Sequence, residues 1–152
     1  MRRPILLAFL IGMAAASAAT PASACSKVTI FFDWNSARIA PDSRAALERF
    51  AVALAWKGPD LDQVLLTSHT DSSGSDAANR DIARRRAEAV RAVLLNYHVP
   101  ASLIAISPAG EGRLRVPTGD NVRQQYNRRV ELLMQMSADA QARQMAEGRP
   151  IC

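Results

Sequence analysis

Residues 64–97 read VLLTSHTDSSGSDAANRDIARRRAEAVRAVLLNY, and this stretch decides the fold. Its first four residues, 64–67, form a short apolar run that is typical of a buried strand. Residues 68–75 are polar and include Gly74, which predicts a loop. Residues 77–97 repeat apolar side chains at steps of three and four, which predicts an amphipathic helix. The stretch therefore predicts a strand, a loop and a helix long enough to cross over a sheet.

Similar segments lie on both sides of this unit. Three more short apolar runs predict strands, at residues 28–32, 103–106 and 129–136. A second helical pattern begins at Pro41 and ends at Lys57. The order is strand, helix, strand, helix, strand, strand. We therefore expect an α+β fold in which two main helices cover one face of a small, mixed, four-stranded sheet.

The second helix carries polar residues on a face that should be buried. Asn79, Ala83, Arg86 and Val90 share one side of this helix, since a seven-residue step falls only about 20° short of two full turns. Arg84 and Arg85 lie off that side, and we expect them to be solvated. Because an unpaired buried charge is costly, Arg86 should have a carboxylate partner or a ligand.

Asp71 lies in the loop just before this helix. Loops at strand ends of an open sheet are where ligands commonly bind, and from there Asp71 can face Arg86. An Asp before a helix also commonly caps the helix or forms a structural ion pair. The residues by themselves leave these roles open.

Several spaced motifs share one pattern: Phe31–Phe32–Asp33, His69–Thr70–Asp71 with the Ser and Gly that follow, Asn79, Ile82, Arg86–Ala87, Val90, Gly110–Glu111 and residues 127–132 (NRRVEL). Together they resemble the OmpA-like peptidoglycan-binding domain, a family that includes C-terminal domains of outer-membrane porin-like proteins and the peptidoglycan-associated lipoproteins. The resemblance covers residues 28 to about 136, and it implies a two-layer α+β sandwich. It also implies a non-catalytic protein that binds the diaminopimelate of the cell-wall stem peptide and so tethers or organises the envelope.

The resemblance implies roles for particular residues. Asp71 takes the place of the family's Asp in His-Thr-Asp and Arg86 that of the Arg in Arg-Ala, and these two make the direct ligand contacts. The other ligand-binding residues that it implies are Phe32, Asp33, Asn79, Arg128 and Arg129. Three positions depart from the family pattern, because Ser68 replaces a Gly, Ala83 replaces a Ser, and Leu114 stands where Pro is frequent. We expect the departures to affect affinity more than function.

Residues 1–24 have the composition of a secretory signal peptide. Arg2 and Arg3 precede an apolar run of 12 residues, 5–16, and Ala22–Ser23–Ala24 form a small-residue cleavage site. A membrane-spanning helix would need about 20 apolar residues. We therefore expect export to the periplasm, with attachment to the outer membrane left open. The expected mature chain consists of a domain, residues 25–136, and a polar tail, residues 137–152, that is either helical or irregular.

Cys25 and Cys152 are the first and last residues of this expected mature chain. Two thiols in an oxidising compartment commonly pair, so a disulfide between them is one expectation. Cys25 also follows a small residue at the cleavage point, as the acylated cysteine of a lipoprotein does. A typical lipoprotein signal has Leu three places before the cysteine, where this chain has Ala22. A disulfide, a lipid and neither modification all stay open.

Other function classes have less support. We expect no metal or cofactor, because His69 and Asp71 fall short of the three or four protein ligands that zinc takes. We expect no enzyme, since neither a Gly-x-Ser-x-Gly element nor a Cys-His pair with a third partner is present. Nucleic-acid binding is disfavoured because the net charge of +5 falls to +3 without Arg2 and Arg3, and because basic and aromatic residues do not alternate.

The expected partner is therefore peptidoglycan, with other envelope proteins as further candidates. No second apolar run after residue 24 is long enough to span a bilayer. One alternative function remains. The OmpA-like fold could serve as a protein-interaction subunit of an envelope complex that does not bind peptidoglycan.

Overall fold

The computed structural model describes residues 27–148, so both cysteines and the expected signal peptide lie outside the described residues. The main elements are β1 (Lys27–Phe31), α1 (Pro41–Lys57), β2 (Leu61–His69), α2 (Asp76–Asn96), β3 (Ile104–Gly110), β4 (Arg129–Met136) and α3 (Ala138–Ala146). Three single turns of 3₁₀-helix, at Gly58–Asp60, Ala101–Leu103 and Gln125–Asn127, precede β2, β3 and β4.

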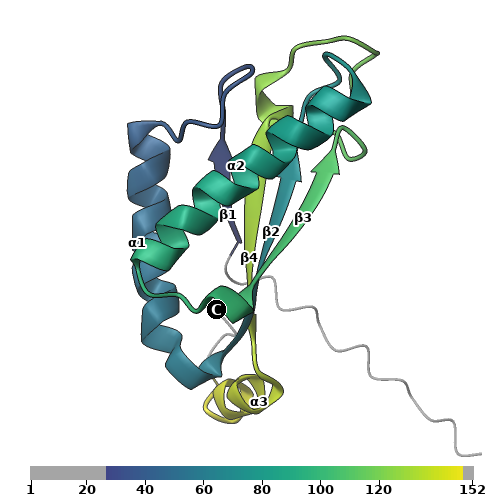
Figure 1. The fold of residues 1–152 in the computed structure, drawn as a ribbon. Coiled ribbons are helices and arrows are strands. Elements are labelled where there is room, and N and C mark those ends of the chain that lie inside the picture. The colour runs from purple at the N-terminus through teal and green to yellow at the C-terminus, as the bar shows by residue number, and fades with distance from the viewer. Residues whose placement is uncertain (1–26, 149–152) are drawn as a thin grey trace, which may run out of the picture.

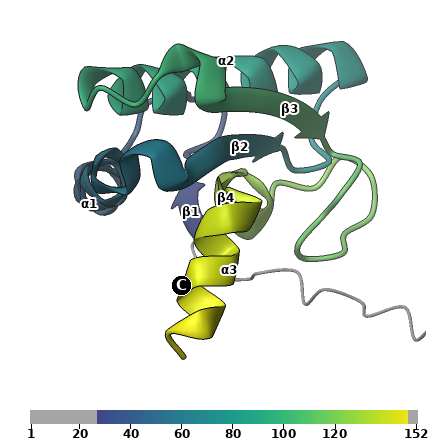
Figure 2. The same ribbon diagram turned by 90° about the horizontal axis from the view of Figure 1, so that it is seen from below.

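The strands form one mixed sheet in the order β1-β4-β2-β3. β4 is antiparallel to both of its neighbours, whereas β2 and β3 are parallel and are connected through α2. Figures 1 and 2 show α1 and α2 on the same face of the sheet. The predicted α+β class, with two main helices over a mixed four-stranded sheet, is confirmed.

The hydrophobic core lies between the sheet and these two helices. Successive side chains of a strand point to opposite faces, so every second residue of the inner strands is available to the core. Helices α1 and α2 cover that face with their apolar sides. The most deeply buried members are Ile30, Val64, Leu66, Val130 and Leu132 from the strands, with Leu47, Ala51, Leu54, Val90 and Leu94 from the helices.

One end of the sheet gathers the loops that build the candidate site. Phe31 and His69 both pair with Arg129, from opposite sides, and His69 also pairs with Gly110. The ends of β1, β2 and β3 therefore lie beside the beginning of β4. α2 begins at this end of the molecule as well (Figure 1), whereas β1 begins at Lys27, which pairs with Leu133 in the middle of β4.

β2 and β3 extend beyond their apolar runs. β2 covers Leu61–His69 where the sequence predicts 64–67, and β3 covers Ile104–Gly110 where it predicts 103–106. Most of the added residues are polar, and one is Pro108, yet they continue the hydrogen-bonded ladder, as in the pairing of Ser68 with Val130. Backbone pairing with β4 thus extends β2 where side-chain hydrophobicity does not.

The tail forms the helix α3. The Ser137 hydroxyl caps its first turn by accepting a hydrogen bond from the Ala140 amide at 3.3 Å. Ala140 is 1% exposed and joins the hydrophobic core, while Arg143 forms an ion pair with Asp60. Of the two structures expected for the tail, helical or irregular, residues 138–146 form the helix.

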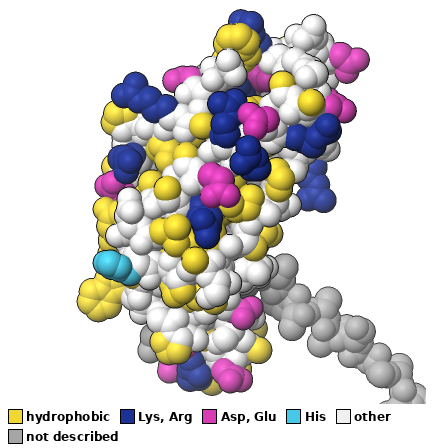
Figure 3. Space-filling model, in the orientation of Figure 1, with side chains coloured by type: hydrophobic (Ala, Val, Ile, Leu, Met, Phe, Trp, Pro, Cys, Tyr) yellow, Lys and Arg dark blue, Asp and Glu magenta, His cyan; other side chains and the backbone are white. Residues whose placement is uncertain are grey.

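The outer face of α2 carries charges of both signs (Figure 3). Arg84 and Arg85 both pair with Asp81, and Arg91 pairs with Glu88. The side chains of Arg84 and Arg85 are more than half exposed, so the prediction that they are solvated is confirmed. Within residues 27–148 no helix is long and apolar enough to cross a membrane.

Candidate functional site

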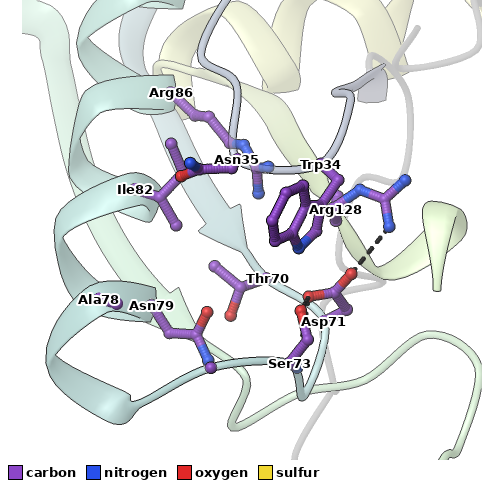
Figure 4. A pocket seen from close by; sticks show the side chains of 11 residues that line it. Trp34, Asn35, Thr70, Asp71, Ser73, Ala78, Asn79, Ile82, Arg86 and Arg128 are labelled. Carbon is purple, nitrogen blue, oxygen red and sulfur yellow. Dashed lines mark hydrogen bonds and ion pairs between the residues drawn. The ribbon is translucent and has the colours of Figure 1, made fainter. Parts of the chain in front are cut away.

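A cavity of about 200 Å³ opens where the loops after β1 and β2 meet the first turns of α2 (Figure 4). This volume is smaller than that of a pocket for a drug-sized ligand, so the cavity suits one end of a larger molecule. Eleven residues line it: Trp34, Asn35, Thr70, Asp71, Ser73, Gly74, Ala78, Asn79, Ile82, Arg86 and Arg128. Four of them, Asp71, Asn79, Arg86 and Arg128, are among the predicted site residues.

Arg86 brings a buried positive charge to this cavity. It is 1% exposed, as its place on the inner side of α2 predicts, and its guanidinium lies 5.3 Å from the centre of the Phe32 ring. Its Nε and Nη2 donate to the carbonyls of Ser36 and Asp33, each at 2.9 Å, and Nη1 donates to the carbonyl of His69 at 3.4 Å. Three of its five N–H groups are used in this way, which leaves one on each terminal nitrogen.

Carbonyl oxygens thus hold Arg86, for which the sequence predicts either a carboxylate partner or a ligand. Within residues 27–148, Arg86 forms no ion pair. Burial and the nearby Arg128 charge lower the pKa of Arg86 to about 10, so this side chain still carries its charge at neutral pH. The result is a fixed cation that forms no ion pair among the described residues and keeps two N–H donors unused.

Asp71 is 3% exposed and faces Arg128. Its Oδ2 accepts from Arg128 Nη1 at 2.8 Å and from the Gln124 amide at 3.1 Å, while its Oδ1 accepts from the Ser73 hydroxyl at 2.7 Å. Burial alone would raise the pKa of Asp71, but the hydrogen bonds from Ser73, Arg128 and Gln124 outweigh it and hold the pKa below its usual value. Asp71 and Arg86 therefore line one cavity, and the ion pair of Asp71 is made with Arg128.

Two further oxygen atoms complete the polar part of the site. Asn79 donates through Nδ2 to Glu111 Oε2 at 2.8 Å, which fixes the amide and leaves Oδ1 as an acceptor. Thr70 Oγ1 is buried and has no hydrogen-bond partner among the described residues. Figure 4 shows both side chains extending into the space between α2 and the loop that carries Asp71 and Ser73.

The other predicted site residues lie beside the cavity rather than in its lining. Phe32 is 2% exposed beneath Arg86, and Asp33 contributes its carbonyl to Arg86 while its side chain is exposed. Arg129 is 5% exposed and donates to Glu131 at 2.9 Å. Neighbouring residues of an extended chain point to opposite faces, so Arg128 and Arg129 cannot both reach the cavity.

Sequence reasoning gave no role to Trp34, Thr70 or Ser73, which all line the cavity. Thr70 and Ser73 flank Asp71 closely in the chain, so their nearness to Asp71 was the available signal. Trp34 follows Asp33 directly, and the available signal was an aromatic side chain in the polar segment after the first strand. Its exposed fraction of 50% places it at the mouth of the cavity.

Comparison with known proteins is consistent with this geometry. Residues 31–128 match the model of the OmpA family. The outer-membrane lipoprotein YfiB of Pseudomonas aeruginosa is 35% identical over 108 residues, which cover 69% of this chain and 61% of that protein. Outer membrane protein A of Escherichia fergusonii is 32% identical over 115 residues, which cover 70% of this chain and 47% of that protein. The matched stretch spans less than two thirds of either relative.

Solved structures agree with the fold. The peptidoglycan-associated lipoprotein from Burkholderia pseudomallei has a TM-score of 0.64 at 25% identity, covering 70% of this chain and 89% of that one. The C-terminal domain of Helicobacter pylori MotB has a TM-score of 0.65 at 22% identity, covering 78% of this chain and 92% of that one. The relatives named above are outer-membrane proteins and lipoproteins, so the predicted location in the cell envelope is confirmed.

Proposed function

Because the chain belongs to the OmpA family, we propose that its cavity binds peptidoglycan without catalysis, through the diaminopimelate of the stem peptide. Binding of this kind tethers or organises the cell envelope. The observation that carries the proposal is the buried guanidinium of Arg86, which three carbonyls hold in place and which forms no ion pair within residues 27–148. The similarity to a lipoprotein named as peptidoglycan-associated supports the same function.

Arg86 is suited to the carboxylate of the ligand. The free end of diaminopimelate is a zwitterionic amino-acid centre, with an ammonium and a carboxylate a few ångströms apart. The two unused N–H groups of Arg86 lie on its two terminal nitrogens, so they can donate as a pair to the two oxygens of one carboxylate. Charge favours this contact too, because Asp71 and Arg128 neutralise each other and leave Arg86 as the net charge of the cavity.

The ammonium of the ligand requires acceptors on the opposite side of the cavity. Asp71 supplies one if the Ser73 hydroxyl, a neutral donor, gives up Oδ1 and turns elsewhere. Thr70 Oγ1 and Asn79 Oδ1 supply two more without breaking any hydrogen bond of the described residues. Phe32 and Asp33 act through Arg86, and Arg128 acts through Asp71, so these three are positioning residues.

The arrangement predicts which cell walls are bound. A stem peptide with Lys in place of diaminopimelate keeps the ammonium and lacks the carboxylate, so Arg86 would stay unpaired. The loss of a charge-assisted hydrogen bond to a buried group costs about 1.5 to 3 kcal/mol, which is roughly ten- to a hundredfold in affinity. Walls of the diaminopimelate type should therefore be strongly preferred over walls of the Lys type.

Sedimentation with purified cell wall tests the proposal. Wild type should co-sediment with diaminopimelate-type walls, free diaminopimelate should compete and free lysine should not. Arg86→Lys should weaken binding, because Lys lacks the planar pair of donors, and Asp71→Ala with Arg86→Ala should abolish it. Arg85→Ala is the matched control, because Arg85 is next to Arg86 in the chain. Its side chain is 52% exposed and pairs with Asp81. Undiminished sedimentation of a folded Asp71→Ala, Arg86→Ala double variant would refute the proposal.

One observation favours the alternative of a protein-interaction subunit. Trp56 is 85% exposed near the end of α1, at the end of the molecule away from the cavity (Figure 1). An exposed Trp is typical of contact surfaces between proteins. If Trp56→Ser abolishes envelope function in cells while the purified variant still binds cell wall, a protein contact at α1 is needed in addition to the cavity.

A further inference from the structure

Arg123 and Trp34 form a stacked pair at the mouth of the cavity. The Arg123 guanidinium carbon lies 3.7 Å from the centre of the Trp34 ring system. This pair lines a second and more open hollow together with Ser73, Gly74 and Asn121. Trp34, Ser73 and Gly74 also line the cavity of Asp71 and Arg86, so the two spaces are neighbours.

The backbone around Arg123 is fixed by the loop that carries Asp71. The Asn121 amide donates to the Ser72 carbonyl at 2.9 Å, and the Val122 amide donates to the Ser72 hydroxyl at 3.2 Å. On the other side of Arg123, the Gln124 amide donates to Asp71 Oδ2 at 3.1 Å. Arg123 is therefore held on both sides at a defined position relative to the cavity.

Stacking leaves the donors of Arg123 available. A guanidinium that lies over an aromatic ring uses its flat face, while its N–H groups point outward in the plane. Within the described part of the chain, the Arg123 side chain makes no hydrogen bond or ion pair, in contrast to Arg44, Arg84 and Arg143, which each pair with a carboxylate. The edge of Arg123 is thus presented, already oriented, to a carboxylate in the second hollow.

We propose that Arg123, stacked on Trp34, forms a second subsite that binds a carboxylate flanking the diaminopimelate in the stem peptide. This inference rests on the proposed function. Two carboxylates have the required chemistry and lie one residue from diaminopimelate, namely the α-carboxylate of the preceding γ-linked D-glutamate and the C-terminal carboxylate of a following D-alanine. Both residues are attached to the α-centre of diaminopimelate, which three methylene groups separate from the free end in the cavity. Either carboxylate can therefore reach a hollow that adjoins the cavity.

A set of four ligands tests the subsite. They are free diaminopimelate, the tetrapeptide L-Ala-γ-D-Glu-diaminopimelate-D-Ala, the same tetrapeptide with its D-glutamate α-carboxylate amidated, and the tetrapeptide with its D-alanine carboxylate amidated. The protein is compared with Arg123→Gln and with the control Arg115→Gln. Arg115 belongs to the same loop and also lies over an aromatic ring, 5.7 Å from the centre of Phe31, but it lines neither space.

Arg123→Gln should weaken tetrapeptide binding about fivefold, the upper range for an exposed charge pair, and leave free diaminopimelate unchanged. Amidation of the contacted carboxylate should weaken wild-type binding by the same factor and have no effect on Arg123→Gln, which identifies the source of the carboxylate. Equal affinity of wild type and Arg123→Gln for the tetrapeptide overturns the subsite, and so does an equal loss for free diaminopimelate. Failure of wild type to bind free diaminopimelate overturns the proposed function as well, so the two failures are distinguishable.

Discussion

Arg128 Nη1 lies 2.8 Å from Asp71 Oδ2, and the same guanidinium donates through Nε to the Phe32 carbonyl at 3.1 Å. One side chain therefore joins the loop after β2 to the exit of β1, at the edge of the cavity. Both members of this ion pair are buried, so each depends on the other for compensation of its charge.

Removal of one partner of this ion pair should lower the free energy of unfolding more than removal of both. Arg128→Met leaves the Asp71 carboxylate buried without its partner, and we expect a loss of about 3 kcal/mol in the free energy of unfolding. The double variant Asp71→Asn, Arg128→Met should recover part of that loss, as measured by urea denaturation. If Arg128→Met costs the same in wild type and in Asp71→Asn, the two side chains are not coupled.

Ser68 should destabilise the fold slightly. Its hydroxyl is fully buried and has no hydrogen-bond partner among the described residues. Ser68→Ala removes this oxygen and should raise the free energy of unfolding by about 1 kcal/mol. A folded variant that unfolds at lower urea concentration than wild type would show that the hydroxyl has a stabilising contact.

His69 should make stability depend on pH. Burial, followed by the nearby charge of Arg129, lowers the pKa of His69 from 6.5 to about 4, so between these values the unfolded chain binds a proton that the folded chain does not. The free energy of unfolding should therefore fall as the pH drops from about 6.5 to 4, by about 3 kcal/mol, with no further contribution from His69 below that range.

The comparison for this prediction is urea denaturation of His69→Leu across the same pH range. Leu cannot titrate, so the variant should lack the fall that wild type shows. His98→Leu is the matched control, because His98 is exposed on the turn after α2 and should leave the fall in place. An identical pH profile for wild type and His69→Leu would assign the dependence to other groups.

Ser73 should compete with the ligand ammonium for Asp71. Its hydroxyl donates to Asp71 Oδ1 at 2.7 Å, so Ser73→Ala leaves that oxygen only the long hydrogen bond from the residue 73 amide, at 3.4 Å, without a change in the charge of the cavity. We expect the affinity for diaminopimelate to be retained or increased, as measured by calorimetry. A large loss would mean that the Ser73 hydroxyl itself contacts the ligand or that it fixes the Asp71 rotamer.

The mass of the mature protein should decide its processing. Cleavage before Cys25 predicts an N-terminus at residue 25, and the three states of the cysteines differ in mass. A thioether-linked diacylglycerol adds lipid, a disulfide between Cys25 and Cys152 removes two hydrogens, and free thiols leave the mass unchanged. An intact Met1 on the functional protein would contradict the predicted export signal.

Local patterns predicted the part of the site that lies within one helix. The spacing of Asn79 and Arg86 in a helix follows from the helical period, and both are buried on the inner side of α2 as that period requires. The ion pair of Asp71 does not follow from such a pattern, since its partner Arg128 is 57 positions away. That pairing depends on the register of β2 against β4, which sets His69 opposite Arg129 and which no local pattern states.

The limits of the helices and strands show the same difference between what local patterns predict and what depends on distant residues. α1 begins and ends at Pro41 and Lys57, as its proline and glycine signals predicted. The end of β2 was missed because Ser68 and His69 are polar, and only the neighbouring strands make them part of the ladder. The stacking of Arg123 on Trp34 joins two loops far apart in the chain, so it too required the folded structure.

The placement of Lys27 and the cavity at opposite ends of β1 determines how the domain would bear a mechanical load. A pull applied at Lys27, against a ligand held at the cavity, would run along the strands. β1 would then be loaded lengthwise against β4, to which all five of its residues are paired from Lys27 to Phe31. In that direction the hydrogen bonds of the β1–β4 ladder resist together in shear, whereas a sideways pull would break them one after another. The domain is thus oriented to resist tension between its first strand and a ligand held in the cavity.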